Sequence, residues 1–400
     1  MRPALFRFLP VVILLAAPVV NAQEPAPASE TVASSLARER EEERGSRDVF
    51  PDLNLYLPEG EFDIRLRKLI KNVLFEGQVN YNFVDGDVST FLRYKYYARK
   101  YTYKIGLFDT LEFDSLESGS DDFDRTRGAL LLFEFPVEYN RRYLALLQTD
   151  ALSFGDVTNV DHDQDNFYLK LGYQIGTPFD ERLNGIVGET RGRITPVLTA
   201  YREIGPQKTG VAAAITHSLD FAGSDYEYTK LEAEGLKRLD FGETFMISRL
   251  HVGSVLSSSR IEGREELDLD EQFTIPRYEL FRIGGRDALK GLDDHRRGAD
   301  EIHLSNEFFY PIFRNRDYET WWLSWNNLYG IAYVGSGSVG FGADTFSELD
   351  GYAVDAGLGF EASLTFRDYE IFLSAVYART VAGPEILEND EIRFSARTIR

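Results

Sequence analysis

Apolar and polar side chains alternate, residue by residue, along most of this 400-residue chain. Residues 75–83 have phenylalanine, valine and tyrosine at odd positions, and glutamate, glutamine and asparagine at even positions. Residues 167–175, 352–363 and 369–377 show the same alternation. Because successive side chains of a β-strand point to opposite faces, each segment would have one apolar and one wet face. The pattern predicts an all-β protein.

The length of these segments separates the two main all-β architectures. Each runs for about 10 to 13 residues, as a tilted transmembrane strand does, whereas strands of a soluble sandwich average about five or six. About fifteen such segments can be counted, including one near residue 193. A single-chain bacterial barrel has an even strand number. We therefore predict an antiparallel transmembrane β-barrel of about 16 strands if residues 62–71 contribute the first, with about 14 as the alternative.

The N-terminus has the pattern of a secretory signal peptide. Arg2 and Arg7 flank its start, residues 8–20 are almost wholly apolar, and small residues precede Gln23. The apolar run is too short for a membrane helix of about 20 residues. Residues 1–22 are therefore expected to direct export. Together with the barrel pattern, they predict a protein of the outer membrane of a Gram-negative bacterium.

The composition agrees with a lipid-facing surface and argues against several function classes. The 22 tyrosines and 29 phenylalanines suit lipid-facing strand surfaces and interfacial girdles. The net charge of −21 argues against nucleic acid as a partner, because its phosphates attract cations. With no cysteine, the chain has no disulfide framework, no thiolate nucleophile and no cysteine metal site.

The segment before the alternating region has two parts. Residues 23–60 contain proline, alanine and serine and then many charges, which predicts a flexible periplasmic tether. Residues 61–72 have apolar side chains at helical spacing, opposite a basic set made of Arg65, Arg67, Lys68 and Lys71. This spacing favours an amphipathic helix at an anionic membrane surface, followed by a barrel over residues 73–400. The same residues also alternate as a first barrel strand would.

The longest expected connection ends shortly before residue 300 and carries a glycine-rich, basic motif. Its residues are Gly284, Gly285, Arg286, Lys290, Gly291 and Leu292. Glycine allows positive φ and lets the backbone approach another surface closely. A loop of this composition is expected to fold against a surface, and the strands around it would supply a barrel lumen.

Residues 277–292, followed by Ser305-Asn-Glu-Phe-Phe-Tyr-Pro-Ile312, resemble the BamA/TamA superfamily of outer-membrane assembly and translocation barrels, also called the bacterial surface antigen family. In that family a long extracellular loop before the last five strands inserts a basic-glycine-aromatic tip into the lumen. The resemblance implies one long lumen-folded extracellular loop in this chain. Its basic residues would meet inward carboxylates, for which the candidates are Glu307, Asp355 and Glu361.

The motif departs from the family pattern at three positions. Lys290 stands where the family has arginine, Leu292 where it has an aromatic residue, and Gly335 where it has an aspartate that pairs with the arginine. Lysine lacks the planar fork of arginine, so a bidentate pair is impossible here. The interval between Gln23 and the first strand is also too short for a periplasmic POTRA domain. The resemblance therefore implies a barrel-only member.

No catalytic arrangement is evident in the sequence. The five histidines are scattered, and the neighbours His217 and Ser218 would point to opposite faces of a strand. Acidic clusters such as residues 161–165 could bind calcium, but solvated loops are the better interpretation. We expect no enzyme, no cofactor and no metal site.

The resemblance implies a non-enzymatic role in outer-membrane biogenesis, through insertion or translocation of protein or another envelope component. The partners would be outer-membrane lipid and either a nascent outer-membrane protein or a periplasmic partner. In this hypothesis the first and last strands pair weakly. The alternative is a passive pore or structural barrel that keeps the fold without assembly activity. The sequence leaves the oligomeric state open.

Overall fold

The computed structural model describes most of the chain between Pro51 and Ile399. The described ranges are 51–57, 61–82, 88–98, 101–113, 122–138, 141–156, 160–175, 209–260, 275, 279–284, 289–292, 297–314, 318–320, 323–341, 343–347, 351–366, 369–383 and 390–399. The predicted signal peptide (residues 1–22) and residues 23–50 of the predicted tether lie outside them.

Strands make up nearly all of the described residues. In chain order they are β1 (Pro51–Leu57), β2 (Glu61–Ile70), β3 (Val73–Asn82), β4 (Val88–Tyr97), β5 (Thr102–Phe113), β6 (Asp122–Glu138), β7 (Arg141–Asp156), β8 (Val160–Ile175), β9 (Thr209–Ser218), β10 (Tyr226–Phe241), β11 (Thr244–Arg260), β12 (Phe281–Arg282), β13 (Arg297–Gly298), β14 (Asp300–Phe313), β15 (Tyr318–Thr320), β16 (Leu323–Gly340), β17 (Ala353–Phe366), β18 (Tyr369–Ala382) and β19 (Asp390–Ile399). Two short 3-10 helices, η1 (Asp220–Ala222) and η3 (Ala343–Phe346), lie in connections. Within the described ranges, no helix has the length and hydropathy needed to cross a membrane.

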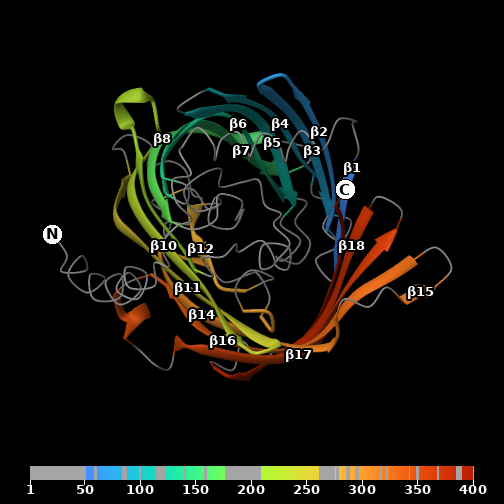
Figure 1. The fold of residues 1–400 in the computed structure, drawn as a ribbon. Coiled ribbons are helices and arrows are strands. Elements are labelled where there is room, and N and C mark those ends of the chain that lie inside the picture. Colours follow the sequence, from blue (N-terminus) through green and yellow to red (C-terminus); the bar gives the residue numbers. More distant parts are fainter. Residues whose placement is uncertain are drawn as a thin grey trace.

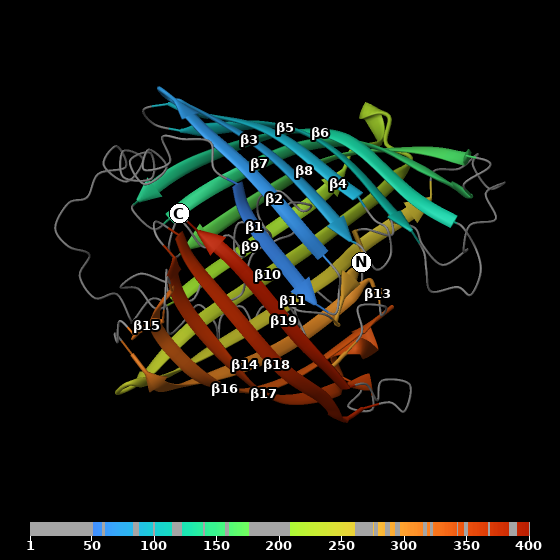
Figure 2. The same ribbon diagram turned by 90° about the vertical axis from the view of Figure 1, so that its right-hand side faces the viewer.

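The strands pair antiparallel around a ring (Figure 1). Each of β1 to β10 pairs with the next, β11 pairs with β14, and the ladder continues through β16, β17, β18 and β19. β19 then pairs with β1, where Asn54 lies opposite Arg397. The ring of described strands thus has the eleven members β1–β11 and five more, while β15 extends the hairpin beside β16. The all-β antiparallel prediction is confirmed, and the strands cross the wall at a tilt (Figure 2).

The two faces of the wall have opposite chemistry, as the alternation predicts. Large apolar side chains are exposed on the outside, among them Leu92, Tyr310 and Leu358 at 62 to 70 %. On the inside, Lys170 and Asp355 are completely buried. Charged residues inside and apolar residues outside reverse the usual order of a soluble protein. This arrangement is the one that a transmembrane barrel with a polar interior requires.

Aromatic side chains gather at the end of the barrel that holds the short turns after β2 and β4. Tyr103 contacts Tyr94, Tyr96 and Phe133 at ring-centroid distances of 5.3 to 6.4 Å. Further pairs extend this group along β3 to β8: Phe75–Tyr94, Tyr101–Phe135, Phe133–Phe135 and Tyr143–Tyr173. Such a group matches the aromatic girdle at a membrane interface.

The predicted amphipathic helix over residues 61–72 is wrong, and the alternative of a strand is correct. Glu61–Ile70 is β2, which pairs with β1 on one side and along its whole length with β3 on the other. Pairing on both sides satisfies the backbone N–H and C=O groups that a helix would otherwise satisfy internally. A tight turn at Lys71 and Asn72, with Lys71 at a φ of 57°, leads into β3.

The four cations of this segment do not share a helical face. The side chains of Lys68 and Lys71 are exposed. Arg65 and Arg67 lie at ladder positions opposite Gln78 and Glu76, two residues that are buried on the inner face of β3. The helical spacing of the basic residues was therefore accidental, since strand alternation assigns them to both faces.

The end of the predicted tether also needs correction. Residues 51–57 were assigned to the flexible segment 23–60, but they form β1. The barrel therefore begins near Pro51, before the predicted start at residue 73. β1 is held by ladders on both sides, with β2 and with β19.

Candidate functional site: a loop anchored in the barrel lumen

The described parts of the segment between β11 and β14 lie inside the ring of strands. β12 and β13 form a separate two-stranded sheet there (Figure 1). The backbone N–H of Leu289 donates to the carbonyl of Ile283 at 2.9 Å, so the chain turns back on itself between them. Ile283, Leu289 and Leu292 are at most 2 % exposed and pack against Ala353 and Val339. The predicted lumen-folded loop is thus present in the described residues.

The tip of this loop is anchored by charge and by backbone hydrogen bonds. The ammonium of Lys290 forms an ion pair with Glu307 on β14, and both side chains are more than nine-tenths buried. The N–H of Gly291 donates to Asp355 Oδ2 on β17 at 2.8 Å. Thr380 on β18 donates its hydroxyl hydrogen to the carbonyl of Gly291 at 3.2 Å. Three wall strands, the neighbours β17 and β18 and the more distant β14, therefore hold a two-residue tip.

Tyr333 on β16 links the ion pair to the backbone contacts. Its hydroxyl accepts from the N–H of Lys290 at 3.3 Å and donates to Asp355 Oδ1 at 3.0 Å. The ammonium of Lys290 also lies 5.1 Å from the centre of the Tyr333 ring, within the range of a cation–π contact. Asp355 thus accepts two hydrogen bonds, which is how a completely buried carboxylate is stabilised.

The carboxylate of Asp355, from the neighbouring strand, occupies the space beside Gly335, whereas the acid paired with Lys290 is Glu307. Gly335 lies directly opposite Asp355 in the ladder between β16 and β17. A Cβ atom at Gly335 would lie 2.5 Å from Asp355 Oδ1 and 2.7 Å from Leu289 Cδ2. Glycine at 335 is therefore required by space, because the carboxylate and the loop occupy the volume that a side chain would need.

Gly291 is also required by space. A Cβ atom at this position would lie 2.8 Å from the carbonyl carbon of Arg379 and 2.9 Å from the amide nitrogen of Thr380. Both are backbone atoms of β18, which cannot move aside without disturbing the ladder. The loop backbone therefore approaches the wall as closely as glycine alone permits.

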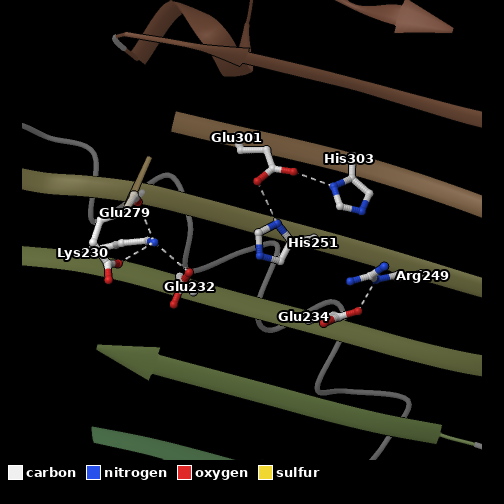
Figure 3. A network of polar contacts seen from close by, with 8 residues as sticks. All are labelled: Lys230, Glu232, Glu234, Arg249, His251, Glu279, Glu301 and His303. Carbon is white, nitrogen blue, oxygen red and sulfur yellow. Dashed lines mark hydrogen bonds and ion pairs between the residues drawn. The ribbon is translucent and has the colours of Figure 1, made fainter. Parts of the chain in front are cut away.

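A second anchor holds the stem of the loop against β10 and β11 (Figure 3). The ammonium of Lys230 donates to the carbonyl of Glu279 at 2.8 Å and lies 3.2 Å from its carboxylate. The same ammonium lies 4.4 Å from the centre of the Phe281 ring. That ring covers Gly253, where a Cβ atom would lie 2.8 Å or less from it. Tip and stem are thus fixed at two separate places.

The sequence-predicted residues divide into three groups. Gly284, Lys290, Gly291 and Leu292 are buried in the lumen, and Lys290 and Gly291 contact the candidate acids Glu307 and Asp355. Glu361 is buried on the inner face of β17, opposite Tyr329 and Ser374 in the ladders. Gly285 and Arg286 lie outside the described residues.

The buried network of ion pairs on β10 was not predicted from the sequence. Glu232 bridges Lys170 on β8 at 2.9 Å and Lys230 at 3.0 Å, and Glu234 forms an ion pair with Arg249. A signal was present, because residues 230, 232 and 234 alternate with apolar neighbours and so share the inner face. The partners on β8 and β11 could not be named, since they depend on strand register.

The histidine and serine at 217 and 218 behave as expected. His217 is exposed, and Ser218 is 1 % exposed on the opposite face. They cannot act together as a nucleophile and its base, because the strand separates them.

Comparison with known proteins gives matches in structure but not in sequence. No protein-family model and no curated protein matches the chain. Among solved structures, BamA from Haemophilus ducreyi lacking POTRA domains 1–3 matches with a TM-score of 0.61 and 15 % identity, over 87 % of this chain and 69 % of that one. CdiB from Escherichia coli matches with a TM-score of 0.58 and 10 % identity, over 87 % and 62 % of the two chains. CdiB from Acinetobacter baumannii matches with a TM-score of 0.56 and 12 % identity, over 87 % and 59 %.

These matches establish the fold. This chain has a BamA-type barrel, and the resemblance recognised in its sequence is confirmed at that level. It spans less than two thirds of the length of the two CdiB chains. A shared fold by itself does not carry an activity from one protein to another.

Proposed function

We propose that this chain is a non-enzymatic outer-membrane barrel that takes part in outer-membrane biogenesis, by inserting or translocating a protein or another envelope component. In this role it lies in the outer membrane of a Gram-negative bacterium, in contact with lipid. Its partner is a nascent outer-membrane protein or a periplasmic protein that delivers one. The BamA-type fold and the anchored lumen loop support the proposal.

The observation that carries the proposal is the short seam between the first and last strands. Within the described residues, four positions of β19 pair with β1, from Arg397 to Phe394. Ten positions of the same strand pair with β18 on its other side. Backbone groups without a partner are costly in lipid, so the strand edge that is exposed when this ladder opens can accept an incoming strand. The seam is where such an exchange would begin.

The lumen loop complements this seam. It contacts β10, β14, β17 and β18 through its stem and tip. These contacts stabilise the wall from β10 to β18. A barrel held in this way can open at β1 and β19 without losing the rest of its structure, because each ladder is an independent set of hydrogen bonds.

The test locks the seam with a disulfide in cells depleted of the natural protein. Asn54→Cys with Arg397→Cys places two thiols at directly paired positions, in a chain that has no other cysteine. We expect the oxidised variant to reach the membrane but to lose the ability to maintain outer-membrane protein and lipid levels. Reduction should restore that ability.

The matched control keeps the same substitution on β19. Phe372→Cys with Arg397→Cys locks β19 to β18, a ladder that the proposal leaves closed, and it should retain function. Two results would contradict the proposal: unchanged protein and lipid levels after depletion, or full function of the oxidised Asn54 variant.

A further inference from the structure

Two histidines and a glutamate meet on the inner faces of β11 and β14 (Figure 3). His251 on β11 lies directly opposite His303 on β14 in the ladder. Glu301 precedes His303 by two residues and therefore shares its face. All three residues are at least nine-tenths buried. Three groups that commonly bind transition metals thus come together from two adjacent strands.

The carboxylate of Glu301 lies between the two imidazoles. Its Oε1 atom is 2.7 Å from His303 Nδ1, and its Oε2 atom is 3.2 Å from His251 Nδ1. The two imidazole centres are 5.3 Å apart. One nitrogen or oxygen atom from each of the three residues can be chosen so that all lie within 4.8 Å of one another. The three side chains therefore converge on one small volume.

Hydrogen bonding within the described residues leaves this group incomplete. His303 Nε2 is buried and has no hydrogen-bond partner there. His251 Nδ1 is near Glu301 but without the alignment of a hydrogen bond. Buried polar atoms in proteins are normally paired, so these two atoms call for an explanation.

Four nearby buried acids are each paired with a permanent cation, and Glu301 differs from these four. Glu232 is paired with Lys170 and Lys230, Glu279 with Lys230, Glu234 with Arg249, and Glu307 with Lys290. In the described part of the chain, Glu301 is in contact with two histidines, which carry a charge only when protonated. A cation bound at Glu301 would therefore have the role that lysine or arginine has at those four acids.

We propose that His251, Glu301 and His303 bind a divalent transition metal of the Zn²⁺ type. Imidazole nitrogen and carboxylate oxygen suit zinc and its neighbours in the first transition row, whereas Ca²⁺ and Mg²⁺ prefer sites made of oxygen alone. Three protein ligands leave one position of a tetrahedron for water or another small group. Coordination bonds of about 2.0–2.2 Å require the side chains to close slightly from their present separations.

The site lies at the root of the lumen loop. Its ligands come from β11 and β14, the two strands that the loop connects, and the ring of Phe281 in the loop is 6.0 Å from that of His251. A bound metal joins these strands and so stabilises the base from which the loop enters the lumen. Metal binding and loop docking are thereby coupled.

The test uses the full chain purified in detergent and freed of metal by a chelator. Titration with Zn²⁺ is followed by calorimetry, and elemental analysis gives the amount retained after desalting. We expect one Zn²⁺ per chain and a higher unfolding temperature with Zn²⁺ than with Ca²⁺ at the same concentration. His303→Gln and His251→Gln should each weaken binding at least about tenfold.

His217→Gln is the matched control, because His217 is an exposed histidine on β9. It should bind Zn²⁺ as the natural chain does. Visible absorption of the Co²⁺-loaded natural chain reports tetrahedral coordination without any variant, in case a variant fails to fold. Absence of stoichiometric Zn²⁺ and of a tetrahedral Co²⁺ spectrum overturns the proposal. Equal loss of binding in His217→Gln and His303→Gln also overturns it, since it would indicate adventitious surface binding.

Discussion

The seam between β1 and β19 and the wall that the lumen loop contacts, from β10 to β18, are stabilised in different ways. The seam joins β1 and β19 through four described pairs, from Asn54–Arg397 to Leu57–Phe394. The wall from β10 to β18 has long ladders, and β10 and β11 pair from Tyr226 to Phe241. It also has buried ion pairs and the two anchors of the loop. Among the described contacts, those from inside the barrel stabilise the wall from β10 to β18, whereas the contacts described between β1 and β19 are those of the backbone ladder.

Removing the loop would test this contrast most severely. A ring of about 16 strands encloses an aqueous channel unless something fills it. We therefore expect deletion of residues 277–297 to turn a poorly conducting barrel into one with a large, steady conductance in planar bilayers. Lys71→Gly, a change at a distant turn, serves as the control. If the conductance of the natural barrel is already large and the deletion leaves it unchanged, the loop does not close the lumen and the passive-pore alternative gains support.

Breaking the ion pair at the tip should have the next largest effect. Lys290→Met leaves Glu307 as an uncompensated buried charge, which costs about 3–5 kcal/mol. The measurement is urea-induced unfolding in lipid, together with protease sensitivity of the loop. Lys290→Met with Glu307→Met should recover most of the loss, because two apolar side chains replace the pair. A single variant that is as stable as the double variant would contradict the role of the pair.

The exposed pair of Arg127 and Asp109 provides the control for that experiment. Their side chains are 57 % and 37 % exposed, and their atoms approach to 3.2 Å. Water screens such a pair, so Arg127→Met should cost about 0–1 kcal/mol.

Placing an aspartate at position 335, as in the BamA/TamA pattern, tests whether the lumen can hold an acid on β16 in place of Asp355 on β17. Gly335→Asp inserts a side chain into the volume of Asp355 and Leu289, and overpacking of this kind costs about 1–3 kcal/mol. Exchanging both residues, Gly335→Asp with Asp355→Gly, removes the clash and restores one carboxylate near Lys290. Thermal unfolding should show that the exchange is more stable than Gly335→Asp alone. The opposite order would mean that the acid cannot be relocated between the two strands.

The smallest expected effect lies beside the seam, at the turn between β2 and β3. Lys71 has a φ of 57°, a left-handed conformation that costs a residue with a Cβ atom about 1–2 kcal/mol. Lys71→Gly removes this strain but loses backbone entropy, so a net gain of about 0.5–1 kcal/mol is expected. Measured destabilisation on urea-induced unfolding would show that the Lys71 side chain itself contributes.

The described strands differ in part from the segments that the alternation predicts. A predicted segment near residue 193 lies outside the described residues, and β8 pairs directly with β9, for example at Ile175 and Val211. β1, which had been assigned to the tether, belongs to the ring through its pairing with β2 and β19. Alternation identifies long strands reliably, but a seven-residue strand such as β1 is too short for its alternation to be recognised.

The helix predicted over residues 61–72 failed for a related reason. Phe62, Leu66 and Ile70 fit both a helical and a strand spacing. A segment of this length cannot decide between the two by itself, because its backbone hydrogen bonds can be satisfied either way. The neighbours β1 and β3 decided the outcome by offering a ladder on each side.

The sequence by itself determined the all-β class, the polar inside and apolar outside of the wall, and the loop that enters the lumen. These follow from alternation and from glycine, which are local properties of the chain. Only the tertiary structure decided that Asp355 fills the space at Gly335 and holds Gly291, that Lys230 holds Glu279, and that His251 meets Glu301 and His303. Each of these contacts depends on the register between strands or on where the loop docks. The alternation fixes the face that each side chain takes, but a register shifted by two residues keeps the same faces, so the pattern cannot specify which residues meet across two strands.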